Sequence, residues 1–147
     1  MKKIFFLIST FLIINSFNTL KASNTISLKE YLKDKNIEEG STQIYLLNRC
    51  SAVYTFASAV ILESDTLNSK KFIEIANNLL FKSVELRIID DKEKSGSAKR
   101  KAEKERKKLF KNYTADGKKN WDKNKSYFEG SYISEDMLIC SKLVEDK

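Results

Sequence analysis

Apolar residues recur at helical spacing along most of this chain, and its most apolar stretch lacks the alternation that is typical of a β-strand. Residues 27–30 read S-L-K-E, the pattern of a helix capping box, and predict a short helix from Leu28 to about Lys35. Residues 41–63 come next and are apolar around most of the helix circumference. The apolar positions at helical spacing are Ile44, Leu47, Cys50, Tyr54, Ala57 and Ile61, with Leu46, Val53 and Val60 as a second stripe. Such a helix is a buried one, so we predict that this segment is central to the fold.

Two amphipathic segments follow the predicted central helix. Residues 64–66 read S-D-T, a cluster of good N-cap residues, and predict a helix from about Leu67 to Asp90. A second helix, predicted from residue 98 onward, has only a thin apolar stripe and is expected to be loosely held. The stripe consists of Ala98, Ala102, Leu109 and Tyr113, with Phe110 beside it.

The C-terminal third predicts two further helices, because glycines interrupt the pattern at residues 117 and 130. Past Gly117, Trp121 and Phe128 are seven residues apart, which suits one short amphipathic helix. Ser131 or Ser134 then caps the last helix. One face of that last helix is expected to carry Ile133, Met137, Cys140 and Val144.

The two cysteines connect the predicted central helix to the last one. Cys50 and Cys140 are the only cysteines, and both fall on inward stripes. We therefore predict an all-α fold, a small bundle of four or five helices, with one disulfide joining the central and last helices. The residues expected to be buried together are Leu47, Tyr54, Ile61, Leu79, Leu80, Val84, Met137 and Val144.

The N-terminus resembles a secretory signal peptide. Lys2 and Lys3 precede an apolar run from residue 4 to 14, and small residues surround Ala22. A cleaved signal at residues 1–22 is favoured over a retained membrane anchor, because Asn15 shortens the usable apolar run below the ~20 residues of a spanning helix. The remaining residues, 23–147, are predicted to form one domain, and no transmembrane helix is expected after cleavage. The protein is therefore predicted to be exported, either periplasmic or secreted.

The positive charge of the protein is local. The whole chain has a net charge of +7, and removal of residues 1–22 takes away three lysines. The basic segment at residues 92–111 holds ten basic and three acidic residues, so the rest of the predicted mature chain is acidic. Such a segment can be a solvated spacer or a surface that contacts an anion. The anionic-contact candidates, within a helix at 97–111, are Lys99, Arg100, Lys101, Lys104, Arg106, Lys107 and Lys108.

Aromatic residues are concentrated in the C-terminal third, among several lysines. Stacked rings beside cations can hold sugars or single-stranded nucleic acid. We favour the alternative, in which these aromatic side chains cover the open end of a small bundle. Trp121 is the candidate for an exposed aromatic contact.

The sequence offers no catalytic or metal-binding motif. Histidine is absent and only two cysteines occur, so no His- or Cys-based zinc site, no Ser-His-Asp arrangement and no cofactor is expected. Neighbouring acids at 38–39, 90–91 and 135–136 leave a small hydrolase with a carboxylate site as a third hypothesis. Glu135 and Asp136 are accounted for by the positive end of the helix dipole.

Two contact functions take precedence over that enzyme hypothesis. The first is a non-enzymatic exported helical protein that acts by contact with a protein or with the envelope. The second is a module that binds anionic lipid or glycan through the basic helix. Because an exported protein rarely meets nucleic acid, we expect an envelope protein or an anionic surface as partner.

Overall fold

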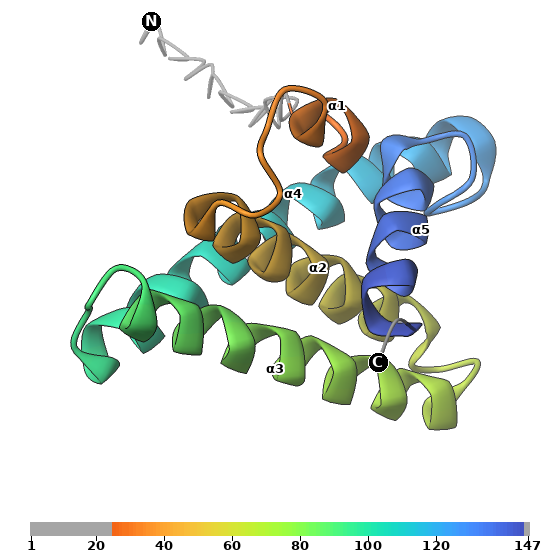
Figure 1. The fold of residues 1–147 in the computed structure, drawn as a ribbon. Coiled ribbons are helices and arrows are strands. Elements are labelled where there is room, and N and C mark those ends of the chain that lie inside the picture. The colour runs from red at the N-terminus through yellow and green to blue at the C-terminus, as the bar shows by residue number, and fades with distance from the viewer. Residues whose placement is uncertain (1–24, 146–147) are drawn as a thin grey trace, which may run out of the picture.

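A computed structural model describes residues 25–145, and in this range the chain is a bundle of helices without β-strands (Figure 1). The predicted all-α fold is confirmed. The helices are α1 (Leu28–Leu32), α2 (Gly40–Ile61), α3 (Thr66–Ile89), α4 (Ser95–Asn124) and α5 (Tyr132–Glu145).

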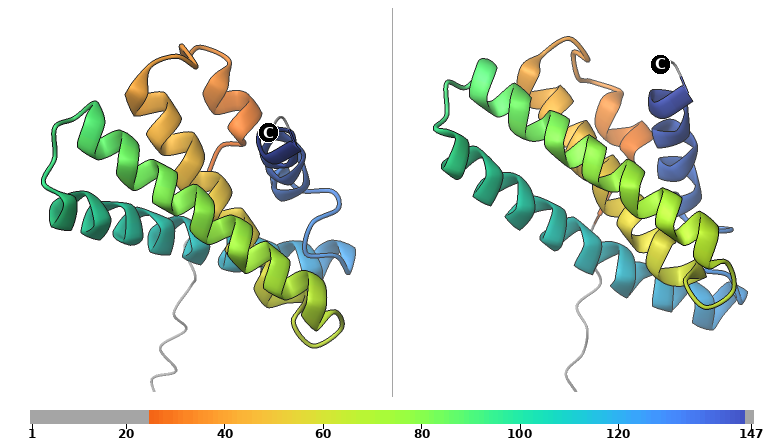
Figure 2. Two further views of the ribbon diagram at one scale, coloured as in Figure 1. Left: turned by 60° about the horizontal axis from the view of Figure 1, so that its bottom comes forward. Right: turned by 90° about the horizontal axis from the view of Figure 1, so that it is seen from below.

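Helix α2 is the central element, as predicted. It packs against α3, α4 and α5, and α1 packs against α5. The two further views show α3 and α4 on one side of α2 and the short α1 with α5 on the other (Figure 2). Among the described helices α2 alone has the length and apolarity of a membrane span, but most of it is buried inside the molecule. Its apolar character is therefore that of a core helix.

The start of α3 follows the capping prediction. The Asp65 side chain accepts a hydrogen bond from the backbone N–H of Asn68 at 3.0 Å. Helix α1 also begins as predicted, because the Ser27 hydroxyl accepts from the Glu30 N–H. It ends at Leu32, slightly earlier than expected.

The largest difference from the sequence prediction lies in α4. Gly117 was interpreted as a helix stop, but α4 continues through it to Asn124. The predicted short helix carrying Trp121 and Phe128 is therefore wrong: Trp121 belongs to α4, and Phe128 lies in the loop that follows. Gly117 is buried about two turns before the end of α4, where the ring of Phe56 lies so close that an added Cβ would come within 2.5 Å of its Cζ. This glycine therefore serves close packing. The thin stripe of α4 is also firmly covered, since Ala98 and Ala102 are fully buried.

Gly117→Ala should destabilise the protein by about 1–3 kcal/mol, the usual cost of overpacking a core. The reason is that Phe56 is itself buried and its ring is surrounded by Tyr113, Tyr127 and Phe128, so it has little room to move. Gly96→Ala in the first turn of the same helix is the matched control.

At residue 96 the nearest atom to an added Cβ is the end of the Arg100 side chain, at 3.4 Å. This substitution should be neutral or stabilise by up to about 1 kcal/mol, because alanine favours helix over glycine. Urea unfolding followed by circular dichroism measures both variants. Equal stabilities for the two would show that Phe56 does not restrict residue 117.

The predicted disulfide is confirmed. Cys50 of α2 and Cys140 of α5 are bonded, with their Cα atoms 5.3 Å apart. Both residues are fully buried, as their positions on inward stripes indicated.

Three of the eight residues predicted to be buried together are buried, and five are only half-buried. Leu47, Tyr54 and Leu79 are buried. The other five are half-buried: Ile61, Leu80, Val84, Met137 and Val144. They lie at the end of α2 or on the outer helices α3 and α5, where a side chain at the edge of the packed face keeps contact with water.

Candidate functional site

The basic segment forms the outward surface of α4. Of the seven contact candidates, six are exposed and one, Arg106, is half-buried. Arg106 points toward α3, where its Nη1 donates to Asn77 Oδ1 at 3.0 Å. Lys99 is exposed but lies about 100° around the helix axis from Arg100, because each residue of an α-helix advances by that angle.

The structure also adds residues to this surface that the sequence analysis left out. Lys111 and Lys118 follow Lys104 at intervals of seven residues, which places them on the same side of α4. Both are exposed. The interval was visible in the sequence, but the interpretation of Gly117 as a helix stop separated Lys118 from the predicted helix. We define the basic face as Arg100, Lys104, Lys107, Lys108, Lys111 and Lys118; at 1.5 Å per residue it spans about 27 Å.

Of the three acids in the basic segment, Glu93 and Glu105 pair with cations outside the basic face, and Glu103 is exposed. Glu105 Oε2 accepts from Arg87 Nη2 of α3 and from Asn48 Nδ2 of α2, both at 2.6 Å. Glu93 pairs with Lys101 at 2.8 Å. The i, i+4 pairs that the sequence allows along α4, such as Lys101 with Glu105, are not formed.

Within residues 25–145 no member of the basic face has an ion-pair partner. Glu105 binds residues of two other helices and pairs its charge with Arg87, while its side chain stays 44% exposed. The positive charge of the basic face is therefore left to the solvent, on a helix whose position is fixed by buried contacts.

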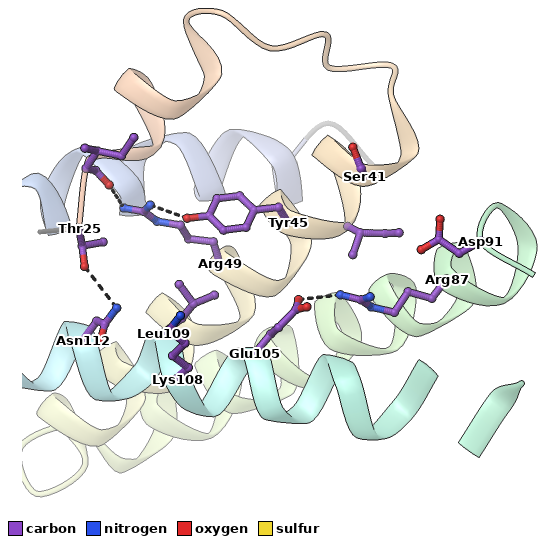
Figure 3. Close-up of a pocket in the computed structure, with 12 residues that line it drawn as sticks. Thr25, Ser41, Tyr45, Arg49, Arg87, Asp91, Glu105, Lys108, Leu109 and Asn112 are labelled. Atoms are coloured by element: carbon purple, nitrogen blue, oxygen red, sulfur yellow. Dashed lines mark hydrogen bonds and ion pairs between the residues drawn. The ribbon is translucent and has the colours of Figure 1, made fainter. Parts of the chain in front are cut away.

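A pocket of about 540 Å³ lies beside the basic face, between α2, α3, α4 and the segment that precedes α1 (Figure 3). Lys108 belongs both to the basic face and to the pocket wall. Opposite α4, Arg87 of α3 and Asp91 of the loop after α3 line the wall, and Ser41 and Tyr45 of α2 close it (Figure 3).

A buried polar cluster ties the segment before α1 to three helices, and the sequence analysis missed it. Arg49 of α2 and Asp136 of α5 form a fully buried ion pair at 2.7 Å. The Tyr113 hydroxyl accepts from Arg49 Nε and donates to Asp136 Oδ2, at 2.9 and 2.6 Å. Asp136 Oδ1 accepts from the Leu28 N–H, and Arg49 Nη2 donates to the Ile26 carbonyl. Asp136 is thus the counter-ion of a buried arginine. The sequence analysis had explained it only by its position at the positive end of the helix dipole.

The protonation states in this cluster are fixed by its surroundings. Burial by itself lowers the pKa of Arg49, but the oxygens of Tyr113, Asp136 and Tyr45 outweigh it, and the net result is a raised pKa. Burial raises the pKa of Tyr113 well above its usual value. Arg49 therefore stays charged and Tyr113 stays neutral, so that each polar group keeps its partner. The sequence signal was an arginine within an apolar helix, because a buried charge requires a partner.

The aromatic candidate Trp121 is partly exposed, at 42%. Its ring stacks on Tyr127 with centroids 4.8 Å apart. Tyr127 and Phe128 in turn contact the ring of Phe56 in the core. Tyr127 and Phe128 thus pack against the core, and Trp121 packs on Tyr127 at the surface.

The neighbouring acid pairs lend no support to hydrolysis by paired carboxylates. Asp136 is occupied by Arg49, and the remaining five acids of the three pairs are exposed. Among the described residues no group of three or more Asp, Glu, His or Cys side chains could hold a metal ion.

Comparisons were made with protein-family models, curated proteins and solved structures. None of the three gives a match to this chain. The arrangement of the described side chains is therefore the basis for assigning a function.

Proposed function

We propose that this is a non-enzymatic exported protein that acts by contact, and that the basic face of α4 binds an acidic surface on an envelope protein. The observation that carries the proposal is the absence, within residues 25–145, of an ion-pair partner for any of the six cations on this face. Exposed charges contribute little to stability, but together they attract an oppositely charged partner over a long range.

Export is part of the same proposal. The signal peptide predicted at residues 1–22 lies outside the described residues. The disulfide between Cys50 and Cys140 is consistent with an oxidising compartment such as a bacterial periplasm. The partner is therefore sought among envelope components, and nucleic acid is not expected to reach the protein there.

Anionic lipid or glycan is the second candidate for the partner. It is supported by the layout of the basic face, which is one row along a single helix and could lie flat on a charged layer. Among the large apolar residues of α4, only Trp121 is exposed. Insertion into a bilayer has little support, and adsorption would rest on charge, at about 1 kcal/mol per lysine near the surface.

Charge reversal on the basic face tests both candidates. In Lys104→Glu/Lys107→Glu/Lys111→Glu, binding to polyglutamate and to phosphatidylglycerol vesicles should fall about a hundredfold or more at low salt, if each lysine contributes about 1 kcal/mol. Fluorescence anisotropy and vesicle sedimentation measure the two affinities. Tighter binding to polyglutamate favours the protein partner, and tighter binding to vesicles favours the lipid.

The control carries the same change in net charge elsewhere on the molecule. Lys29, Lys33 and Lys70 are exposed residues of the α1 region and α3, and their reversal to Glu should leave most of the binding intact. The proposal fails if both triple variants lose affinity equally, because net charge and not the basic face would then govern binding. It also fails if the unaltered protein binds neither probe at low salt.

A further inference from the structure

The pocket beside the basic face has an apolar interior and a charged rim. Its apolar surface comes from Ile26, Ile44, Leu109 and the Tyr45 ring. Ile26 lines the pocket and is 52% exposed, so its apolar side chain is accessible to a ligand. A volume of about 540 Å³ falls within the 300–1,000 Å³ that is usual for ligand sites. The pocket can hold a large side chain together with part of the backbone that carries it.

The charges at the pocket are unevenly distributed. Arg87 and Glu105 neutralise each other across the wall, with Nη2 and Oε2 2.6 Å apart (Figure 3). Arg49 is neutralised by Asp136. What remains is Lys108 on the α4 rim, continuous with the basic face, and Asp91 on the opposite rim. A carboxylate next to a bound apolar group is therefore attracted to the α4 rim and repelled from the other.

We infer that the pocket is the anchor site for the acidic partner: it receives one large apolar side chain, aromatic or leucine-like, from a segment whose neighbouring carboxylates lie on the basic face. This inference rests on the proposed function and specifies the partner's chemistry. Its physical reason is a division of roles. Exposed lysines speed association and set orientation, whereas a large side chain buried in a pocket holds the complex together.

Peptides of known sequence test this inference without a natural partner. Two 15-residue peptides, glutamate-rich and identical except for Trp or Ala at the central position, are titrated against the protein purified after export. The Trp peptide should bind about ten- to a hundredfold more tightly, the factor expected from burying one large apolar side chain.

A blocked pocket should remove this preference. Ser41 is exposed at the start of α2 and lines the pocket, so Ser41→Trp fills the pocket from its rim. The variant should bind both peptides with the affinity of the unaltered protein for the Ala peptide. Ser64→Trp, an equal change at an exposed position beyond the other end of α2, should keep the preference. Ile26→Asn reduces the apolar lining without filling the pocket and should weaken the preference even if Ser41→Trp fails to fold.

The outcomes separate this inference from the function on which it rests. Equal binding of the two peptides, still abolished by reversal of the basic face, would leave the contact function standing and overturn the anchor pocket. A Trp preference that survives both Ser41→Trp and Ile26→Asn would also overturn it. If neither peptide binds at low salt, the basic face itself is refuted as an acidic-partner site, and the anchor pocket is refuted with it.

Discussion

Asp136→Ala should lower the free energy of unfolding by about 3–5 kcal/mol, the range found when one partner of a buried ion pair is removed. The substitution leaves Arg49 charged and fully buried, and it removes the acceptor of the Leu28 N–H and of the Tyr113 hydroxyl. Three tyrosine rings stand 5.7–6.0 Å from the Arg49 guanidinium. They cannot replace a carboxylate, so the charge is left without a counter-ion. Urea unfolding at neutral pH, followed by circular dichroism, measures the loss.

An exposed ion pair of nearly the same length provides the control. Lys101 and Glu93 are 2.8 Å apart, against 2.7 Å for Arg49 and Asp136, but the Lys101 side chain is 56% exposed. Lys101→Ala should therefore cost about 1 kcal/mol or less, because water screens the exposed lysine and Arg87 Nη1, 3.7 Å from Glu93 Oε1, remains as a counter-ion for the carboxylate. If Asp136→Ala costs no more than Lys101→Ala, the buried cluster does not hold α5 and the segment before α1 in place.

Loss of the disulfide should have an effect of similar size. The Cys50–Cys140 bond closes a loop of 90 residues, and in the chain-entropy account such a bond stabilises the folded state by about 4–5 kcal/mol. The same urea unfolding, with and without a reductant, measures the difference. The Cys50→Ala/Cys140→Ala variant should reproduce the reduced protein and lose somewhat more, because it also leaves space in the core.

Hydrogen exchange shows where that stability is lost. Helix α5 packs against α1 and α2, so its amides should exchange faster after reduction than those of α3 and α4. A control is the Cys50→Ala/Cys140→Ala variant treated with the same reductant, which should not change. Identical unfolding of the oxidised and reduced proteins would refute a stabilising role for the bond.

The sequence by itself determined the all-α fold, the helices other than the second half of α4, and the disulfide of this protein. Periodicity is a local property, and residues three or four apart face the same neighbour, so the inward stripes of α2, α3 and α5 could be predicted. Cys50 and Cys140 each fell on such a stripe, which made their pairing predictable although 90 residues separate them. The exposed cations of α4 were likewise predictable, since charged side chains rarely occupy a core.

Only the tertiary structure decided what the charged residues do. Arg49 and Asp136 are 87 positions apart, and no local pattern indicates that one would meet the other. Glu105 pairs with Arg87 of α3, although the sequence of α4 offers lysines at helical spacing. The pairing depends on which helix faces which, and that choice leaves the basic face without partners.

Gly117 shows the same dependence on packing. By local propensity a glycine favours a helix end, but its missing side chain also allows the Phe56 ring to approach α4 closely. Close packing on α2 outweighs the small helix penalty of one glycine, so α4 continues and carries Lys118 onto the basic face. The pocket beside that face is formed by three helices and the segment before α1, and it exists only once they have packed together.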